Sequence, residues 1–188
     1  IYTKKVFVPA KFEAAGKTYD VEVRYRGDNA QHWNAPKKSY LVRFKKNELF
    51  MGMRAISLII PNDRYFALEH FNNYRAKKLG LKVPQSGYAN LEINGANHGL
   101  YFQIESWEPE MLVNFGLPAD TPLYGEVDLE ATGGDIWKDA ALWQDVAHDD
   151  PYPFKHGSKL PELLRLLNEA SDSEFYARVF ELVDRDNF

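Results

Sequence analysis

The stretch from Tyr19 to Phe44, YDVEVRYRGDNAQHWNAPKKSYLVRF, is typical of two β-strands joined by a polar loop. In its first part, aromatic or aliphatic residues at 19, 21, 23 and 25 alternate with charged residues, which is the period of a half-buried strand. In its second part, Tyr40, Val42 and Phe44 recur at the same period. The stretch therefore predicts two neighbouring strands that share one apolar face.

A lysine lies in register with this predicted apolar face. Counting back from Phe44 places Lys38 on the side of Tyr40 and Val42, and Lys37 on the opposite side. Because a charged side chain on a core face is costly unless it is paired, Lys38 is expected to meet an anion, whereas Lys37 is not. The residues alone leave open whether that anion is a carboxylate of a structural ion pair or the phosphate of a ligand.

Length and composition predict a globular protein. The 188 residues suffice for one sizeable core or for a domain with an appendage, and 45% hydrophobic and 14% aromatic residues argue against disorder. No apolar run approaches the ~20 residues that a membrane span requires, and the absence of cysteine excludes disulfides and thiolate metal sites.

The charges are distributed unevenly along the chain. Residues 1–54 hold 12 Lys and Arg against five Asp and Glu, whereas the remaining residues are acidic, and the net charge of the whole is −4. This pattern favours either an anion-binding lobe or a sheet whose edge strands are protected by lysine. Nucleic-acid binding is not expected, because no recognised motif occurs and the chain is acidic overall.

The rest of the sequence adds strands and helices to this pair. Further strand patterns occupy residues 4–13, 54–60, 88–93 and 99–107. A helix is predicted over residues 64–79, capped by Asn62 or Asp63 and closed by Gly80. Within it, one apolar stripe is formed by Leu68, Phe71, Arg75 and Leu79, and the only acid is Glu69.

After Gly116 the pattern is loop-rich, with a strand at 123–127, a helical turn at 140–146, and amphipathic helices at 159–170 and 172–183. Ser171 and Glu174 form a capping box before the last helix. This outline predicts an α+β fold, with residues 1–116 as a sheet-containing lobe and residues 117–188 as a loop-rich and helical segment.

Four local patterns, in this order, resemble the CotH (spore coat protein H) kinase-like family. They are the strand end Arg24–Asp28, the lysine strand Lys37–Phe44, Asn62–Arg64 ahead of a helix that ends at Gly80, and the NG…GLY…E hairpin of Asn94–Glu105. The resemblance runs from about Val21 to Trp107 and continues more loosely through the chain. It implies an atypical protein-kinase-like small lobe, an antiparallel sheet with one packed helix, followed by a helical segment.

The resemblance also implies a function, the transfer of phosphate from ATP, with Mg²⁺, to serine or threonine of a protein substrate. It makes Lys38 the phosphate-holding lysine and gives it a carboxylate partner, for which Glu69 and Glu105 are equal candidates by spacing. The nucleotide-binding residues that it implies are Arg24, Arg26, Gly27, Asn29 and Lys38. A spore-coat, cell-surface or secreted location fits the same family.

Two departures from the family bear on activity. Asp28-Asn29-Ala30 follows the loop glycine, where the family usually has small hydroxyl residues. The family's catalytic and metal-binding aspartates are expected beyond Val183–Phe188, so this chain alone is expected to lack activity. The alternative is a non-catalytic structural or binding module of a surface or coat assembly on the same fold.

Other candidate sites have weaker support. The clusters Asp128, Glu130, Asp135 and His148, Asp149, Asp150 carry ligands that suit Mg²⁺ or Ca²⁺, but they lack the spacing of a calcium loop and are expected to be solvated. The five histidines include no HxxxH or HExxH pair, so a zinc site is not expected. The metal ligands are therefore left unassigned by the sequence.

Overall fold

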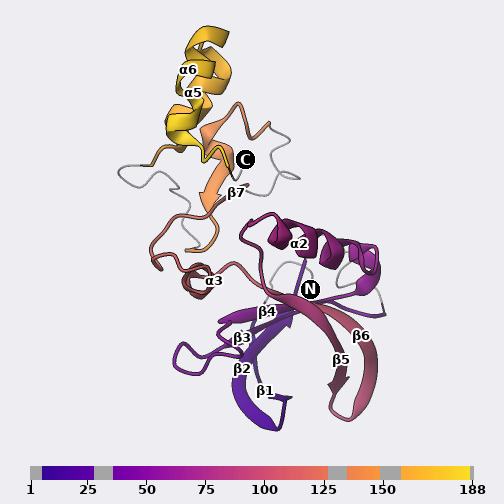
Figure 1. The fold of residues 1–188 in the computed structure, drawn as a ribbon. Coiled ribbons are helices and arrows are strands. Elements are labelled where there is room, and N and C mark those ends of the chain that lie inside the picture. The colour runs from indigo at the N-terminus through magenta and orange to yellow at the C-terminus, as the bar shows by residue number, and fades with distance from the viewer. Residues whose placement is uncertain (1–5, 28–35, 127–134, 149–157, 187–188) are drawn as a thin grey trace. The chain divides into compact units, whose positions relative to one another are not determined.

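The computed structural model describes residues 6–27, 36–126, 135–148 and 158–186. The chain divides into two compact units, residues 1–117 and residues 118–188. The described residues form a mixed α/β protein with a curled antiparallel sheet and four α-helices (Figure 1).

The first unit is built on a six-stranded antiparallel sheet with the order β1-β2-β3-β4-β6-β5. The strands are β1 (Val8–Ala14), β2 (Lys17–Tyr25), β3 (Tyr40–Phe44), β4 (Ala55–Ile59), β5 (Ser86–Ile93) and β6 (Ala96–Glu105). Both predicted hairpins are confirmed, since β1 pairs with β2 and β5 pairs with β6. The second turn is Asn94-Gly95, with φ angles of 51° and 78°, the left-handed pair that a two-residue hairpin requires.

One face of the sheet carries the apolar core. Val21 lies opposite Phe44 and Val23 opposite Val42, so these side chains share a face, as the sequence predicted. Phe44 is only 1% exposed, and its ring lies 5.2–5.4 Å, centroid to centroid, from three other aromatic rings, those of Phe12, Tyr19 and Phe50. This side of the sheet, the core face, is filled by aromatic and aliphatic side chains.

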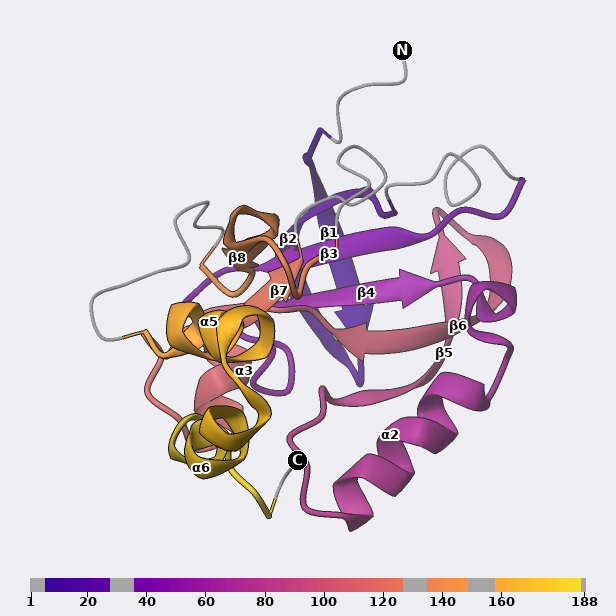
Figure 2. The same ribbon diagram turned by 90° about the horizontal axis from the view of Figure 1, so that it is seen from above.

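The opposite side of the sheet, the helix-bearing face, carries α2 (Leu68–Lys78) (Figure 2). The ring of His70 lies 6.4 Å from the ring of Phe102 and 5.6 Å from that of Tyr88, and its Nδ1 lies 3.3 Å from Ser86 Oγ. The half-buried residues of α2, which recur at helical spacing, are Glu69, His70, Asn73 and Ala76. The helix therefore packs on the sheet through a polar side.

The predicted extent and orientation of this helix are wrong. A 3-10 turn, Pro61–Arg64, comes first, and two left-handed residues, Tyr65 and Phe66, separate it from α2, whose N-cap residue Ala67 makes no side-chain cap. The predicted apolar stripe points outward, with Phe71 55% and Leu79 74% exposed. Polar contacts to the sheet and to the preceding turn, not apolar periodicity, decide which side of α2 is buried.

A short helix, α3 (Pro109–Asn114), follows β6 and ends at Gly116, whose φ of 75° is left-handed. The short helix expected at this point is thus confirmed. In the second unit, β7 (Tyr124–Glu126) pairs with β8 (Trp143–Asp145), and a 3-10 turn occupies Ala140–Leu142. The helical turn expected over 140–146 is correct only for its first three residues, because the chain then extends to pair with β7.

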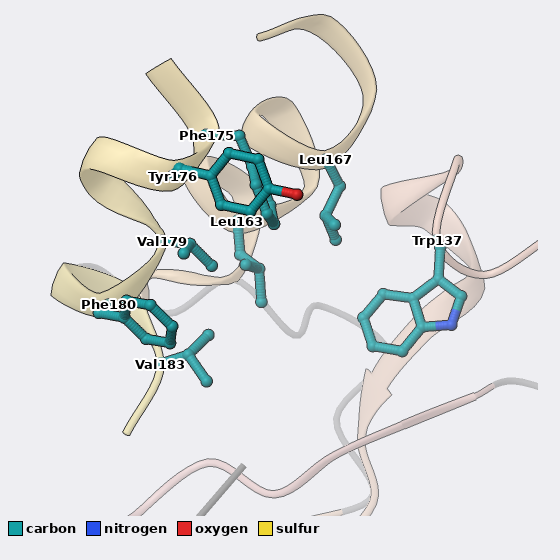
Figure 3. Close-up of a pocket in the computed structure, with 8 residues that line it drawn as sticks. All are labelled: Trp137, Leu163, Leu167, Phe175, Tyr176, Val179, Phe180 and Val183. Carbon is teal, nitrogen blue, oxygen red and sulfur yellow. The ribbon is translucent and has the colours of Figure 1, made fainter. Parts of the chain in front are cut away.

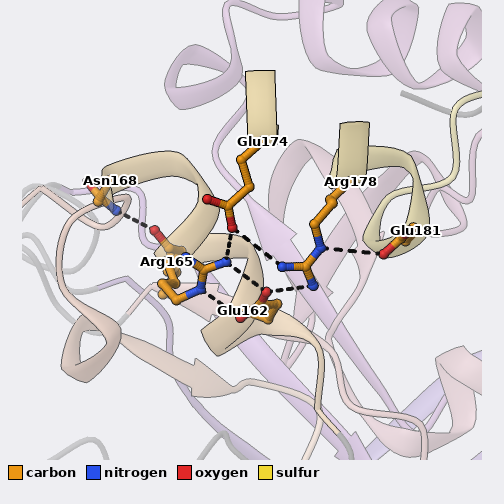
Figure 4. A network of polar contacts seen from close by, with 7 residues as sticks. Glu162, Arg165, Asn168, Glu174, Arg178 and Glu181 are labelled. Atoms are coloured by element: carbon orange, nitrogen blue, oxygen red, sulfur yellow. Dashed lines mark hydrogen bonds and ion pairs between the residues drawn. The ribbon is translucent and has the colours of Figure 1, made fainter. Parts of the chain in front are cut away.

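Two helices complete the second unit, α5 (Leu160–Glu169) and α6 (Asp172–Leu182). Ser171 is the N-cap of α6 and accepts a hydrogen bond from Glu174 N at 3.3 Å, as predicted. Arg165 donates to Glu162 on its own helix and to Glu174 on α6, at 2.7–3.1 Å, and Arg178 lies 2.9 Å from Glu162 (Figure 4). These charge-assisted contacts join the two helices along one side.

Candidate functional site

Cationic side chains gather at the end of the sheet where β2 ends and β3 begins. Tyr25 pairs with Tyr40, and Arg26 N donates to Ser39 O at 2.9 Å, which holds the two ends of the intervening loop together. The structure thus brings close to one another two segments that the sequence singled out, Arg24–Gly27 and Lys37–Ser39. Asn29, the remaining predicted nucleotide-binding residue, lies outside the described residues.

The two arginines belong to the helix-bearing face. Arg24 lies opposite Leu41, which in turn lies opposite Ser57, so the three share that side of the sheet. Arg26 Nε donates to Ser57 Oγ at 3.1 Å, and that hydroxyl lies 3.0 Å from the Oγ of Ser106. Ser57 is buried, and its contact with Arg26 was not predicted, although a serine inside the apolar run RAISLII was a signal for it.

Gly27 follows Arg26 with a φ of 108°, a backbone conformation that side chains disfavour. The chain leaves β2 here and enters the loop that the family resemblance assigns to the phosphates. The glycine is therefore explained by backbone geometry.

Lys38 lies at the rim of the core face. It precedes the first residue of β3, is half-buried, and places its Nζ 5.7 Å from the centroid of the Tyr25 ring. Its backbone carbonyl accepts a hydrogen bond from the Tyr101 hydroxyl at 3.0 Å. Burial, and to a smaller extent the neighbouring Tyr40, raise the pKa of Tyr101 to about 12, so this phenol stays protonated and donates at neutral pH.

Lys37 has close partners of its own. Its Nζ donates to Leu100 O at 2.7 Å and lies 4.4 Å from the centroid of the Tyr101 ring. It also lines a pocket of about 550 Å³ together with residues of the 3-10 turn, among them Asn62 and Asp63. The expectation that only Lys38 points inward is wrong, because both lysines precede β3, where the alternation of a strand no longer fixes side-chain direction.

The two predicted carboxylate partners of Lys38 bind other residues. Glu69 lies 2.9 Å from Arg64 Nε, beside the 3-10 turn. Glu105 is 3% exposed and accepts hydrogen bonds from Asn114 Nδ2 at 2.8 Å and Gln85 N at 3.3 Å. Glu69 thus lies on α2 across the sheet and Glu105 is held near α3, and the expected pairing of Lys38 with one of them stays a prediction.

Glu105 gives a test of this assignment that does not depend on any ligand. Burial raises the pKa of its carboxyl, and the two hydrogen bonds only partly oppose that effect. The folded protein thus holds this proton to higher pH than the unfolded chain does. The contribution of the Glu105 proton to the free energy of unfolding is therefore complete below the pKa that Glu105 has in the unfolded chain. That contribution is lost as the pH rises through the pKa that Glu105 has in the folded protein.

We therefore expect Glu105→Gln, which keeps an acceptor for Asn114, to flatten the pH dependence of the free energy of unfolding above pH ~4.5. Urea unfolding between pH 4 and pH 8 measures this dependence in both proteins. Glu110→Gln, at an acid in the first turn of α3, serves as the control. Equal slopes for Glu105→Gln and the parent chain would contradict the assigned environment.

A second hollow, a groove of about 350 Å³, lies in the second unit between α5, α6 and Trp137 (Figure 3). Its walls are apolar and aromatic, with Leu163, Leu167, Phe175 and Val179 among them, and among the residues that the structure describes no charged side chain lines it. A groove of this composition does not suit a phosphate.

Metal ligands are not grouped in the described parts of the chain, where no three His, Asp or Glu side chains are placed to hold an ion. Of the acidic positions considered from the sequence, 128, 130, 149 and 150 lie outside those parts. His148 contacts Asp145 Oδ2 at 2.7 Å and Ala119 O at 2.8 Å, and Asp135 accepts from Trp137 N. No helix within the described ranges is long and apolar enough to cross a membrane.

Comparison with known proteins identifies the family. The profile of the CotH kinase protein family matches residues 23–188. The chain belongs to this family. It is also 26% identical, over 195 residues, to the inner spore coat protein H of Bacillus subtilis (strain 168). That match covers 96% of the chain and 51% of the relative, so the chain spans about half the length of this CotH protein. The resemblance drawn from the four motifs is confirmed.

Proposed function

We propose that the chain is the nucleotide-holding part of a CotH-type kinase, which transfers phosphate from ATP to serine or threonine of a protein. The observation that carries the proposal is that Arg24, Arg26 and Lys37 gather at one end of the sheet in a member of this family, with Lys38 beside them at the rim of the core face. A sheet with one helix packed on it and with cations beside a glycine-containing loop is also the arrangement of a kinase-like small lobe.

The phosphates are placed, in this proposal, on the helix-bearing face. The core face is filled by packed rings, and inserting a charged triphosphate there carries a large desolvation penalty. The other side offers the two arginines and the pocket beside Lys37. An ammonium group has three donors; one of them bonds to Leu100 O, and the proposal assigns the others to phosphate oxygens.

The same pocket suits the Mg²⁺ that accompanies ATP. Asp63 contributes a carboxylate and Asn62 an amide oxygen to its lining, and these are the ligand types that Mg²⁺ prefers. Bound there, the ion would neutralise phosphate charge, and Lys37, which lines the same pocket, would orient the phosphate group.

A thermal-shift titration of the 188-residue chain tests nucleotide binding. A ligand that binds only the folded state at 100 times its dissociation constant stabilises that state by about 2.7 kcal/mol, so ATP with Mg²⁺ is expected to raise the melting temperature by several degrees. Mg²⁺ alone and adenosine with Mg²⁺ are the controls, and both are expected to give smaller shifts. An unchanged melting temperature at millimolar ATP would count against the proposal.

A second candidate is a non-catalytic module of a spore-coat or surface assembly. The name of the relative, an inner spore coat protein, favours it, as does the exposed apolar stripe on α2. A protein that also includes the family's catalytic and metal-binding aspartates, incubated with radiolabelled ATP and casein, separates the two candidates. Label on casein, absent when Lys37 and Lys38 are both replaced by alanine, would exclude a purely structural role.

A further inference from the structure

The outward side of α2 is an unpartnered surface with a defined composition. Leu68 is 50%, Phe71 55%, Tyr74 57% and Leu79 74% exposed, although a helix normally turns such residues toward its own core. Side chains three or four residues apart lie on the same side of a helix. The surface that we call the outer face of α2 therefore consists of Leu68, Phe71, Tyr74, Arg75, Lys78 and Leu79.

This face is also basic. Arg75, Lys77 and Lys78 occupy the last turn of α2, whereas Glu69, the acid of its first turn, is half-buried and paired with Arg64. The guanidinium of Arg75 lies 5.8 Å from the centroid of the Phe71 ring, and Lys78 Nζ lies 5.5 Å from that of Tyr74. Apolar and aromatic groups thus run along the stripe, with the cations beside them in its C-terminal part, and the stripe presents no acidic group.

The sheet side of the helix keeps this orientation in place. His70 contacts Ser86, Tyr88 and Phe102, and the Tyr88 hydroxyl donates to Phe66 O at 2.8 Å, just before the helix begins. Rotating α2 to bury Phe71 would break these contacts. Exposure of the outer face is therefore built into the packing of the first unit.

We propose that the outer face of α2 docks an acidic amphipathic helix of a partner protein. Charge complementarity selects acidic residues opposite Arg75 and Lys78, and the exposed leucines and rings select apolar residues at helical spacing. A second copy of the same face does not fit, because it would bring like charges together. The inference does not depend on nucleotide binding.

An anionic bilayer is a poorer match than a protein helix. The two cations lie over the rings of Phe71 and Tyr74, so inserting those rings into hydrocarbon would carry charged groups with them. Moving charged groups out of water into hydrocarbon is costly. A partner helix can instead pack its apolar side chains against the rings and place its acidic side chains beside the cations.

A suitable probe is a fluorescent 18-residue peptide in which leucines recur at intervals of three and four residues, so that they share one side of a helix, with glutamates next to them. Fluorescence anisotropy is expected to show saturable binding to the 188-residue chain, weaker by about tenfold when glutamine replaces every glutamate. Phe71→Ser and Lys78→Glu are each expected to weaken binding by about five- to tenfold. Met51→Ser and Lys46→Glu alter exposed residues of another loop and are expected to change it by less than twofold.

Circular dichroism of each variant confirms that the fold is retained, and melting temperatures within about 3 °C of the parent are expected. The proposal is overturned if the peptide does not bind, or if Phe71→Ser and Lys78→Glu bind it as well as the controls. It is likewise overturned if the parent chain does not bind the peptide but binds phosphatidylglycerol vesicles, and the same two substitutions abolish that vesicle binding. The outer face of α2 would then be a membrane-binding surface. Self-association that Phe71→Ser abolishes would assign the face to a second copy instead.

Discussion

Replacing Lys37 by alanine is expected to weaken ATP binding by about ten- to hundredfold. The reason is the position of its ammonium group, which is fixed by Leu100 O and the Tyr101 ring at the wall of the pocket beside the 3-10 turn. A hydrogen bond to a charged group contributes about 1.5–3 kcal/mol, and 1.4 kcal/mol corresponds to a factor of ten in a dissociation constant. Isothermal titration with ATP and Mg²⁺ measures the loss directly.

Lys38→Ala is the matched control, because the two lysines are adjacent and carry the same charge. Lys38 lies at the rim of the core face near Tyr25, and its contact with Tyr101 is made by the backbone carbonyl, which alanine retains. We expect this variant to weaken ATP binding by less than about threefold. A larger loss for Lys38→Ala than for Lys37→Ala would place the phosphates on the other side of the sheet, and failure of the parent chain to bind ATP would reject the nucleotide site itself.

The strand pattern of the sequence was sufficient to predict the strands and the two hairpins, although not the order of the strands in the sheet. Tyr40, Val42 and Phe44 lie on the core face because strand alternation holds within the paired part of β3: Tyr40 and Val42 are paired with both β2 and β4, and Phe44 with β2. The same reasoning placed Lys38 on the core side, at the rim of which it lies, but it did not foresee the partners and pocket of Lys37, since both lysines precede the first paired residue of β3. The family motifs pointed to the two segments that the structure brings close together. Only the three-dimensional structure, however, shows on which side of the sheet each cation lies.

The carboxylates could not be assigned from spacing for a different reason. Glu105 is buried, as the sequence position on a central strand allowed, but its partner Asn114 comes from α3, and nothing in the sequence links the two. Glu69 is paired through the 3-10 turn that precedes α2, a turn that the continuous helix predicted from residue 64 did not include. Both contacts depend on how the chain folds back to bring a distant segment next to the carboxylate, and the periodicity of the sequence carries no information about that.

Phe44→Ala is expected to lower the free energy of unfolding by about 3–5 kcal/mol, the range for truncating a buried phenylalanine. Phe44 is 1% exposed and contacts three other rings, so alanine would leave a cavity among groups that cannot all close it. The shift of the urea midpoint, followed by circular dichroism, measures the loss. Phe44→Leu, which fills most of the space, is expected to lose less than half as much and keeps the test interpretable if the alanine variant does not fold.

Phe71→Ala is the informative comparison, because periodicity assigned this residue to a buried stripe just as it did Phe44. At 55% exposure on the outer face of α2, its truncation is expected to change the free energy of unfolding by no more than about 0.5 kcal/mol, and alanine's helix propensity offsets part of any loss. A cost above about 2 kcal/mol would mean that α2 packs through its apolar stripe after all. The outer face would then belong to the core, and neither a partner helix nor any other ligand would have access to it.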